Sequence, residues 1–117
     1  MKKIQFDYYD WDEFEHFLNQ LPSKDAAKLV VTIQKIEENG LLIAERQEWI
    51  KKIENNLYEI RSKRASNIQR AIYFQVQGTS YLITNAFTKK SSKTPESEKK
   101  IARNRRKIFL KKRFKNE

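Results

Sequence analysis

The feature that most constrains the fold is a change of apolar periodicity at Leu57. From there to Thr88, apolar side chains recur at every second position, as they do along strands with one buried face. Three segments rich in Ile, Tyr, Phe and Val carry this pattern, namely residues 57–63, 68–76 and 81–88. Their connections are too short for the crossovers that parallel strands need, and Gly78-Thr79 is typical of a two-residue hairpin turn. The sequence therefore predicts an antiparallel meander of three strands.

The residues before the meander predict a short edge strand at 4–9 and then two helices. Asp10, with Glu13 three positions later, has the pattern of a capping box that begins a helix, and Pro22 ends that helix. A second helix is expected to begin at a Ser23 cap and to end at Gly40. Both helices show apolar stripes at helical spacing: Trp11, Phe14, Phe17, Leu18 and Leu21 in the first, and Ala26, Leu29, Val30, Ile33 and Ile36 in the second. The short link between them predicts that they pack as an antiparallel helical hairpin.

The remaining segments complete a prediction of one α+β domain over residues 1–117. Residues 41–56 fit no single period and are interpreted as a loop with a helical turn, and residues 89–95 form a polar linker. Residues 96–114 predict a very basic helix with Ile101, Ile108 and Phe109 on its apolar side. The domain is thus expected to combine a first strand and helical hairpin (1–56), an antiparallel sheet (57–89) and a basic C-terminal helix (95–114).

Charge is distributed very unevenly along the chain. The net charge is +10, yet residues 1–56 carry 8 lysines and arginines against 11 acidic residues, whereas residues 57–117 carry 17 against 4. Such asymmetry indicates a polyanionic partner for the second half: RNA, DNA or an anionic membrane surface, with a merely solubilising surface as the plain alternative.

Other functions are disfavoured by composition. The chain has no cysteine, so it has neither disulfides nor thiolate metal ligands. His16 and the acidic residues around it stand at a helix start, where carboxylates suit the helix dipole, so we expect a surface cluster there rather than a metal site or a paired-carboxylate active site. Without a long apolar run or an apolar stretch after Met1, the expected location is the cytoplasm, with no membrane contact.

Strand register predicts a row of functional side chains on one face of the meander. If Ala65-Ser66 and Gly78-Thr79 are both two-residue turns, Arg61 lies opposite Arg70 and Arg70 opposite Phe87. The same register places Ile72 opposite Asn85 and Phe74 opposite Ile83. Lys63 and Lys89 then lie two residues further along the same face.

Two opposed arginines repel each other unless an anion lies over them. A phosphate fits this role because its oxygens match the guanidinium donors, and Phe87 beside it offers a ring for base stacking. The alternatives are structural: a salt bridge for either arginine, with Glu59 or a helix carboxylate as the partner of Arg61, and ordinary core packing for Phe87.

Four motifs follow one another in the second half: Leu57-Tyr58-Glu59-Ile60-Arg61, Gln69-Arg70-Ala71-Ile72-Tyr73-Phe74, Leu82-Ile83-Thr84-Asn85-Ala86-Phe87-Thr88-Lys89-Lys90, and Lys93-Thr94-Pro95. In order and spacing they resemble the phage-derived HigB-like branch of the RelE/ParE toxin superfamily. The resemblance implies a RelE-like fold and the toxin of a type II toxin–antitoxin system. It also implies metal-free cleavage of messenger RNA on the ribosome through attack by the 2′-hydroxyl, with a helix-turn-helix antitoxin as partner.

The resemblance also implies roles for individual residues. Arg61 and Arg70 would stabilise the reacting phosphate, and Lys89 or Lys90 would orient it or share proton transfer. The residues expected to contact the rest of the RNA are Phe87, Lys63, Tyr73, Arg103 and Arg106. The basic helix as a whole would contact ribosomal RNA backbone.

The sequence departs from the family pattern near its end, where many relatives carry a Tyr or His that transfers a proton. Here the late aromatic residues are Phe109 and Phe114, which cannot do so. Tyr73 and Tyr81 are the candidate replacements, although tyrosine is a weak base and Tyr73 is expected on the face opposite Arg70. Two other functions remain open: a toxin of the same fold that acts on DNA gyrase, and a nucleic-acid-binding module without catalysis.

Overall fold

The alternating segments form the centre of the sheet in the computed structural model, which describes residues 1–90 and 93–115. They are strands β3 (Leu57–Arg64), β4 (Asn67–Gln77) and β5 (Ser80–Lys89), paired antiparallel in sequence order. Both predicted two-residue turns are confirmed, since Arg64 pairs with Asn67 and Gln77 with Ser80. Ala65 and Gly78 adopt positive φ angles of 54° and 55° in these turns, as tight hairpins require.

Two short strands flank the meander. Strand β1 (Gln5–Tyr8) pairs parallel with the first residues of β5, and β2 (Ile50–Glu54) pairs antiparallel with β3. In the described part of the chain, the sheet order is β1-β5-β4-β3-β2. The prediction of a loop with a helical turn for residues 41–56 was therefore partly wrong, because the segment contains helix α3 (Leu41–Arg46) followed by an edge strand.

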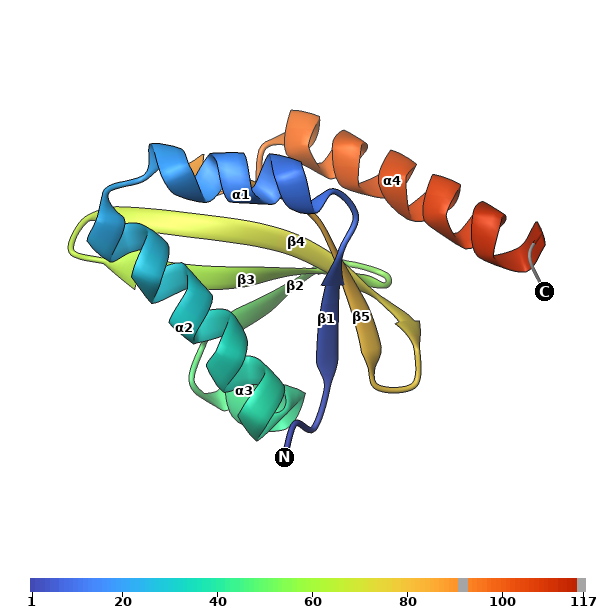
Figure 1. The fold of residues 1–117 in the computed structure, drawn as a ribbon, viewed down its shortest axis with the longest axis horizontal. Helices are drawn as coiled ribbons and strands as arrows, with labels where there is room; N and C mark the ends of the chain where they lie inside the picture. The colour runs from blue at the N-terminus through green and yellow to red at the C-terminus, as the bar shows by residue number, and fades with distance from the viewer. Residues whose placement is uncertain (91–92, 116–117) are drawn as a thin grey trace.

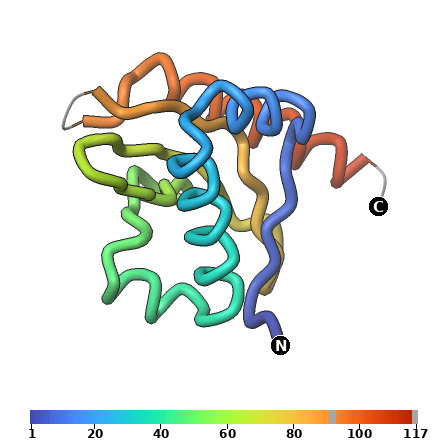
Figure 2. The backbone as a smooth tube through the Cα atoms, turned by 60° about the vertical axis from the view of Figure 1, so that its left-hand side comes forward, coloured from blue at the N-terminus to red at the C-terminus, as the bar shows by residue number. Residues whose placement is uncertain are grey.

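Helices α1 (Trp11–Gln20) and α2 (Ser23–Asn39) follow β1 and cover one face of the sheet with α3 (Figure 1). Asp10 is the predicted N-cap of α1, and its carboxylate accepts a hydrogen bond from the Glu13 amide at 3.0 Å. Ser23 makes no cap bond and is instead the first residue of α2. Gly40 ends α2 at a positive φ of 87°, which suits a residue without a side chain. The two helices are joined by the predicted short link but diverge, so they do not pack side by side as an antiparallel pair and each covers its own part of the face (Figure 2).

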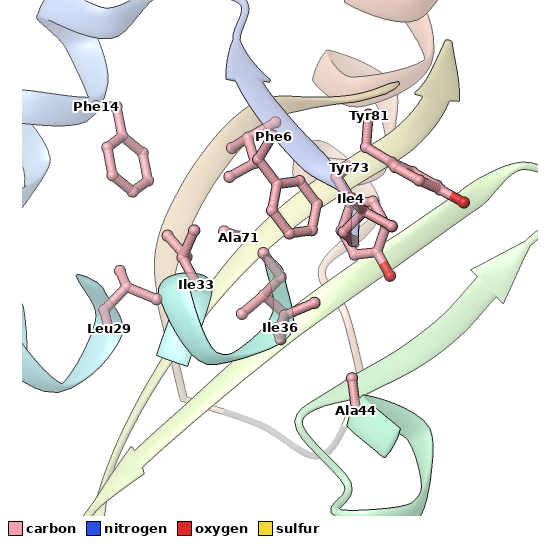
Figure 3. Packing of buried hydrophobic residues seen from close by; sticks show 12 residues of the cluster. Ile4, Phe6, Phe14, Leu29, Ile33, Ile36, Ala44, Ala71, Tyr73 and Tyr81 are labelled. Atoms are coloured by element: carbon pink, nitrogen blue, oxygen red, sulfur yellow. The ribbon is translucent and has the colours of Figure 1, made fainter. Parts of the chain in front are cut away.

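A large apolar core lies between these helices and the sheet (Figure 3). Phe6 meets Tyr73 edge to face with ring centroids 5.0 Å apart, a favourable arrangement for aromatic pairs. The core takes its buried side chains from α1, α2, α3, four of the strands and the residue just before β1: Ile4, Phe6, Phe14, Leu29, Ile33, Ile36, Ala44, Ile60, Ala71, Tyr73, Tyr81 and Ile83. Val30 belonged to the predicted stripe of α2 but is 36% exposed, so the buried stripe is narrower than predicted.

The basic helix α4 (Glu96–Lys115) packs against the opposite face of the sheet. Ala102 is fully buried there, and the ring of Phe109 meets that of Phe74 at 6.0 Å. Only the C-terminal end of α4 reaches past the sheet (Figure 1). Ser91 and Ser92 of the predicted linker lie outside the described residues. None of the described helices combines the length and the apolar character needed to cross a membrane.

The β4–β5 ladder contains a pair of irregularities that cancel. Val76 is an extra residue on β4 between Gln75 and Gln77, and Thr84 is an extra residue on β5 between Ile83 and Asn85. Between them the register is shifted, so Phe74 pairs with Leu82 and the predicted pairing of Phe74 with Ile83 was wrong. Beyond Thr84 the original register returns. Such bulges bend a strand and increase its twist.

Candidate nucleic-acid interface

The predicted row of side chains exists on the face of the sheet that α4 partly covers. Arg61 pairs with Arg70, and Arg70 with Phe87, across β3, β4 and β5. The next row places Lys63 opposite Ile68 and Ile68 opposite Lys89. The geometric prediction of the row is therefore confirmed.

The anion that offsets the repulsion between Arg61 and Arg70 is a carboxylate of the protein itself. Arg70 is completely buried, and its Nη1 forms an ion pair with the Glu59 carboxylate, which is only 2% exposed. Glu59 lies diagonally across the ladder from Arg70 on the same face, within reach of a long side chain. The hydroxyl of Thr94, in the segment just before α4, donates a hydrogen bond to the other carboxylate oxygen at 3.0 Å. The structural alternative considered for Arg70, a salt bridge, is thus the observed arrangement.

The Arg70 guanidinium still has unused hydrogen-bonding capacity. Its Nε and Nη2 atoms are buried and have no hydrogen-bond partner among the described residues. Burial lowers the pKa of Arg70, an effect that the Glu59 carboxylate opposes and the neighbouring Arg61 charge reinforces. The Arg70 side chain is therefore a fixed cation beneath the surface. Its charge is partly offset by Glu59, and two of its nitrogen donors remain unused.

Around this buried pair lies a group of more accessible cations, which we call the cation cluster: Lys51, Arg61 and Lys89. Arg61 is half-buried, and within the described ranges its side chain forms no ion pair. Partial burial lowers the pKa of Lys89, and the charges of Arg70, Arg61 and Lys51 lower it further against the opposing effect of Glu59. Lys63 and Lys90 are exposed beside the cluster.

A groove of about 510 Å³ opens beside the cluster, between β2 and the start of α4. Glu59 and Thr94 contribute to its wall, together with several lysines: Lys51, Lys52, Lys93 and Lys99. A surface that concentrates cations around a hollow of this kind attracts and orients an anion, and phosphate oxygens are the usual acceptors for such donors.

Two predicted RNA contacts are core residues in the structure. Phe87 is only 9% exposed and packs in the core beneath α4 with Ile72, Leu82 and Ala102. Tyr73 is fully buried on the opposite face, stacked on Tyr58 with centroids 5.4 Å apart. Neither ring is open to a base from the cation cluster, so the stacking role expected of Phe87 and the substrate contact expected of Tyr73 do not fit their positions.

The tyrosines are also poor candidates for proton transfer. Burial raises the pKa of Tyr73 far above its ordinary value, with smaller contributions from neighbouring tyrosines and Glu45. Burial likewise raises the pKa of Tyr81. A phenol whose pKa is raised remains protonated near neutral pH and does not accept a proton readily.

Arg103 and Arg106 lie at the far end of β3 from Arg61. Arg103 Nη2 pairs with Glu54 at 2.7 Å, and Arg106 donates to the Asn56 carbonyl at 2.8 Å in the β2–β3 turn. The hydrogen bond from Arg103 raises its own pKa and lowers that of Glu54. Both arginines therefore anchor α4 through contacts within the protein, and their predicted contacts with the substrate stay predictions.

Lys51 and Thr94 belong to the candidate site but were not predicted from the sequence. Lys51 pairs with Glu59, but β2 was not predicted, so nothing placed Lys51 beside the row. Thr94 belongs to the Thr-Pro motif, whose position after the Lys89-Lys90 strand end was the available signal. Glu59 was considered as a partner of Arg61 and instead pairs with Arg70.

The mixed sheet, the helices on one face and the basic helix on the other form a RelE-like α+β fold. A family model described as "Phage derived protein Gp49-like (DUF891)" matches residues 16–107. The chain belongs to this family, which is a family of RelE-like toxins. The curated proteins contain no significant match to the chain.

Proposed function

We propose that the chain is the toxin of a type II toxin–antitoxin system and cleaves messenger RNA on the ribosome. The observation that carries the proposal is the cation cluster around a buried Glu59–Arg70 pair, open to solvent at the strand end of a RelE-like sheet. The basic half of the chain suits an RNA substrate, and family membership supports a toxin.

The proposed reaction uses the RNA's own nucleophile. The 2′-hydroxyl gives its proton to solvent water and attacks the adjacent phosphorus, and the bond from phosphorus to the 5′-oxygen breaks as that oxygen takes up a proton. The products are a 2′,3′-cyclic phosphate and a 5′-hydroxyl end. Arg61 and Lys89 stabilise the charge that develops on the phosphate oxygens. Lys89 is also the candidate proton donor, because its lowered pKa makes its proton easier to release. Lys90 and Lys63 hold the flanking phosphates.

We expect cleavage to depend on the ribosome. Neither Tyr73 nor Tyr81, the two candidates for proton transfer, is a good proton acceptor, so the chain by itself should be a slow nuclease. A ribosome holds the message so that the 2′-hydroxyl, phosphorus and leaving oxygen approach a line, and such positioning contributes roughly 7–11 kcal/mol at best. Mapping of messenger RNA ends after brief induction should show cuts inside translated frames. Purified chain should cut the same RNA efficiently only when translating ribosomes are present.

Other outcomes of this experiment identify the other functions. Efficient cleavage of naked RNA at physiological salt would exclude the ribosome-dependent version of the proposal. DNA damage without new messenger RNA ends would indicate a toxin acting on gyrase. Growth inhibition with no scission of either nucleic acid would indicate a binding module, whose affinity should fall steeply with salt.

The proposal includes an antitoxin, because a free RNA-cleaving surface is harmful to the cell that makes it. We expect a helix-turn-helix protein encoded beside this chain to bind it and to cover the cation cluster or to block its access to the ribosome. Copurification of the co-expressed neighbour tests this partner. Expression of the chain alone with no growth defect would count against both the partner and the toxin.

A further inference from the structure

The arginines of α4 contact neighbouring parts of the fold, whereas most of its lysines are exposed to solvent. Its arginines turn toward the body of the protein. Arg105 Nη1 donates to the Thr84 carbonyl at 2.8 Å and also pairs with Glu13, and its guanidinium lies 5.0 Å from the centre of the Tyr9 ring. Arg113 donates to Gln77 near the β4–β5 turn. With Arg103 and Arg106, these contacts fasten α4 to the sheet along its length.

The lysines of α4 include a stripe on the outer side of the helix. We define the lysine stripe as Lys100, Lys107, Lys111 and Lys115, which are all exposed, with exposed Asn104 filling the gap in the same row. At 3.6 residues per turn these positions fall within an arc of about 80° and span about 22 Å. Ala102 and Phe109, which pack on the sheet, lie on the opposite side of the helix. No ion pair within the described part of the chain involves the stripe.

From this division we infer that the lysine stripe is a second RNA-binding surface, separate from the cation cluster, which holds the phosphate backbone of a double-helical RNA segment. A straight, rigid row of cations complements a duplex, whose phosphates are also held in a fixed, regular row. Lysine presents a single mobile charge rather than a planar fork, so the stripe binds phosphate without reading sequence. The phosphate contacts that the sequence predicted for Arg103 and Arg106 thus belong to the lysines instead.

The composition of the stripe favours RNA over other anionic partners. Lysine is depleted from the cores of protein–protein interfaces, which need apolar and aromatic side chains that this row does not contain. Binding to an anionic membrane would need a broad apolar face beside the cations. Phe109 and Leu110 are packed against the sheet, and the large apolar side chains that α4 does expose, Ile101 and Phe114, stand singly near its two ends. Interfaces with nucleic acid, in contrast, are polar and strongly positive.

The test measures binding of a short RNA duplex to the purified full-length chain at several salt concentrations. In the stripe variant, Lys100, Lys107 and Lys111 are changed to Gln. A plot of log affinity against log salt has a negative slope, and each lost phosphate contact makes that slope shallower by about 0.9. For the three substitutions we expect the slope to become shallower by roughly 2 to 3 units. The matched control changes Lys3, Lys24 and Arg46 to Gln. It removes the same charge from exposed positions elsewhere and should leave the slope nearly unchanged.

The outcomes separate this inference from its rivals. If the slope becomes equally shallow in the stripe variant and in the control, only net charge matters and the inference is wrong. An unchanged slope in the stripe variant would also overturn it. If duplex binding survives but the co-expressed antitoxin or anionic vesicles no longer bind, the stripe serves that partner instead and the inference is wrong. Binding is measured without strand scission, so the result stands even if the chain proves not to cleave RNA.

Discussion

Replacing Arg61 with alanine is expected to abolish growth arrest while leaving the protein folded. Arg61 is half-buried and, among the described residues, its side chain has no ion pair to lose, so the cost in stability should stay within about 0.5 kcal/mol. Loss of one donor to the developing charge on a phosphate typically lowers the rate on the order of 10²–10³-fold. Growth after induction, messenger RNA ends and thermal unfolding together provide the measurement.

Arg46→Ala is a suitable control for this experiment. Arg46 is an exposed arginine in α3, so its replacement removes the same charge away from the cation cluster. We expect this variant to arrest growth as the wild type does. Full toxicity of Arg61→Ala at equal expression would show that the cation cluster is not the site of the reaction.

The second large effect is expected at the buried ion pair. Changing Glu59 to Ala leaves the Arg70 charge buried without its partner, and Arg70→Ala does the same to the Glu59 carboxylate. Breaking a buried pair in this way costs about 3–5 kcal/mol, so both single variants should lose much of their stability in urea denaturation. A loss of toxicity in either single variant could therefore come from unfolding, from loss of function or from both.

A double variant, Glu59→Leu with Arg70→Met, separates the two effects. Replacing both charges with apolar side chains of similar size is often neutral or stabilising, so this variant should be several kcal/mol more stable than either single variant. Because the Nε and Nη2 donors of Arg70 lie beneath the cation cluster, we expect the double variant to be folded but unable to arrest growth. A folded double variant with wild-type toxicity would show that the Arg70 charge serves stability alone.

The three-strand meander and the row of Arg61, Arg70 and Phe87 across it were predictable because their sequence signals are local. Alternation of apolar residues identified the three central strands, and two-residue turns left one choice of register at Arg61 and Arg70. The N-cap of α1 was equally local, since Asp10 contacts an amide three residues away. Glu13 was different. The capping box predicts that its carboxylate accepts a hydrogen bond from the Asp10 amide. In the structure that carboxylate pairs instead with Arg105, 92 residues away in the sequence.

The parts that were not predicted depend on contacts between distant segments. Strand β2 is a five-residue edge strand with two exposed lysines, too short for periodicity to identify. The face on which Phe87 lies follows from strand parity, but its burial depends on where α4 crosses the sheet. The same crossing gives Arg103 and Arg106 partners near the β2–β3 turn. Sequence alone showed that these residues were cationic but not which of them would be used internally.

The paired bulges of the β4–β5 hairpin also determine where the chain can change in length. Val76 and Thr84 each have no partner of their own across the ladder, so removing either one would leave every other pairing as it is, including that of Arg70 with Phe87. The hairpin between Arg61 and Arg70 has no such spare residue. One residue gained or lost there would turn one arginine to the opposite face. Length variation within the family should therefore be found near Val76 and Thr84 and be excluded between residues 61 and 70.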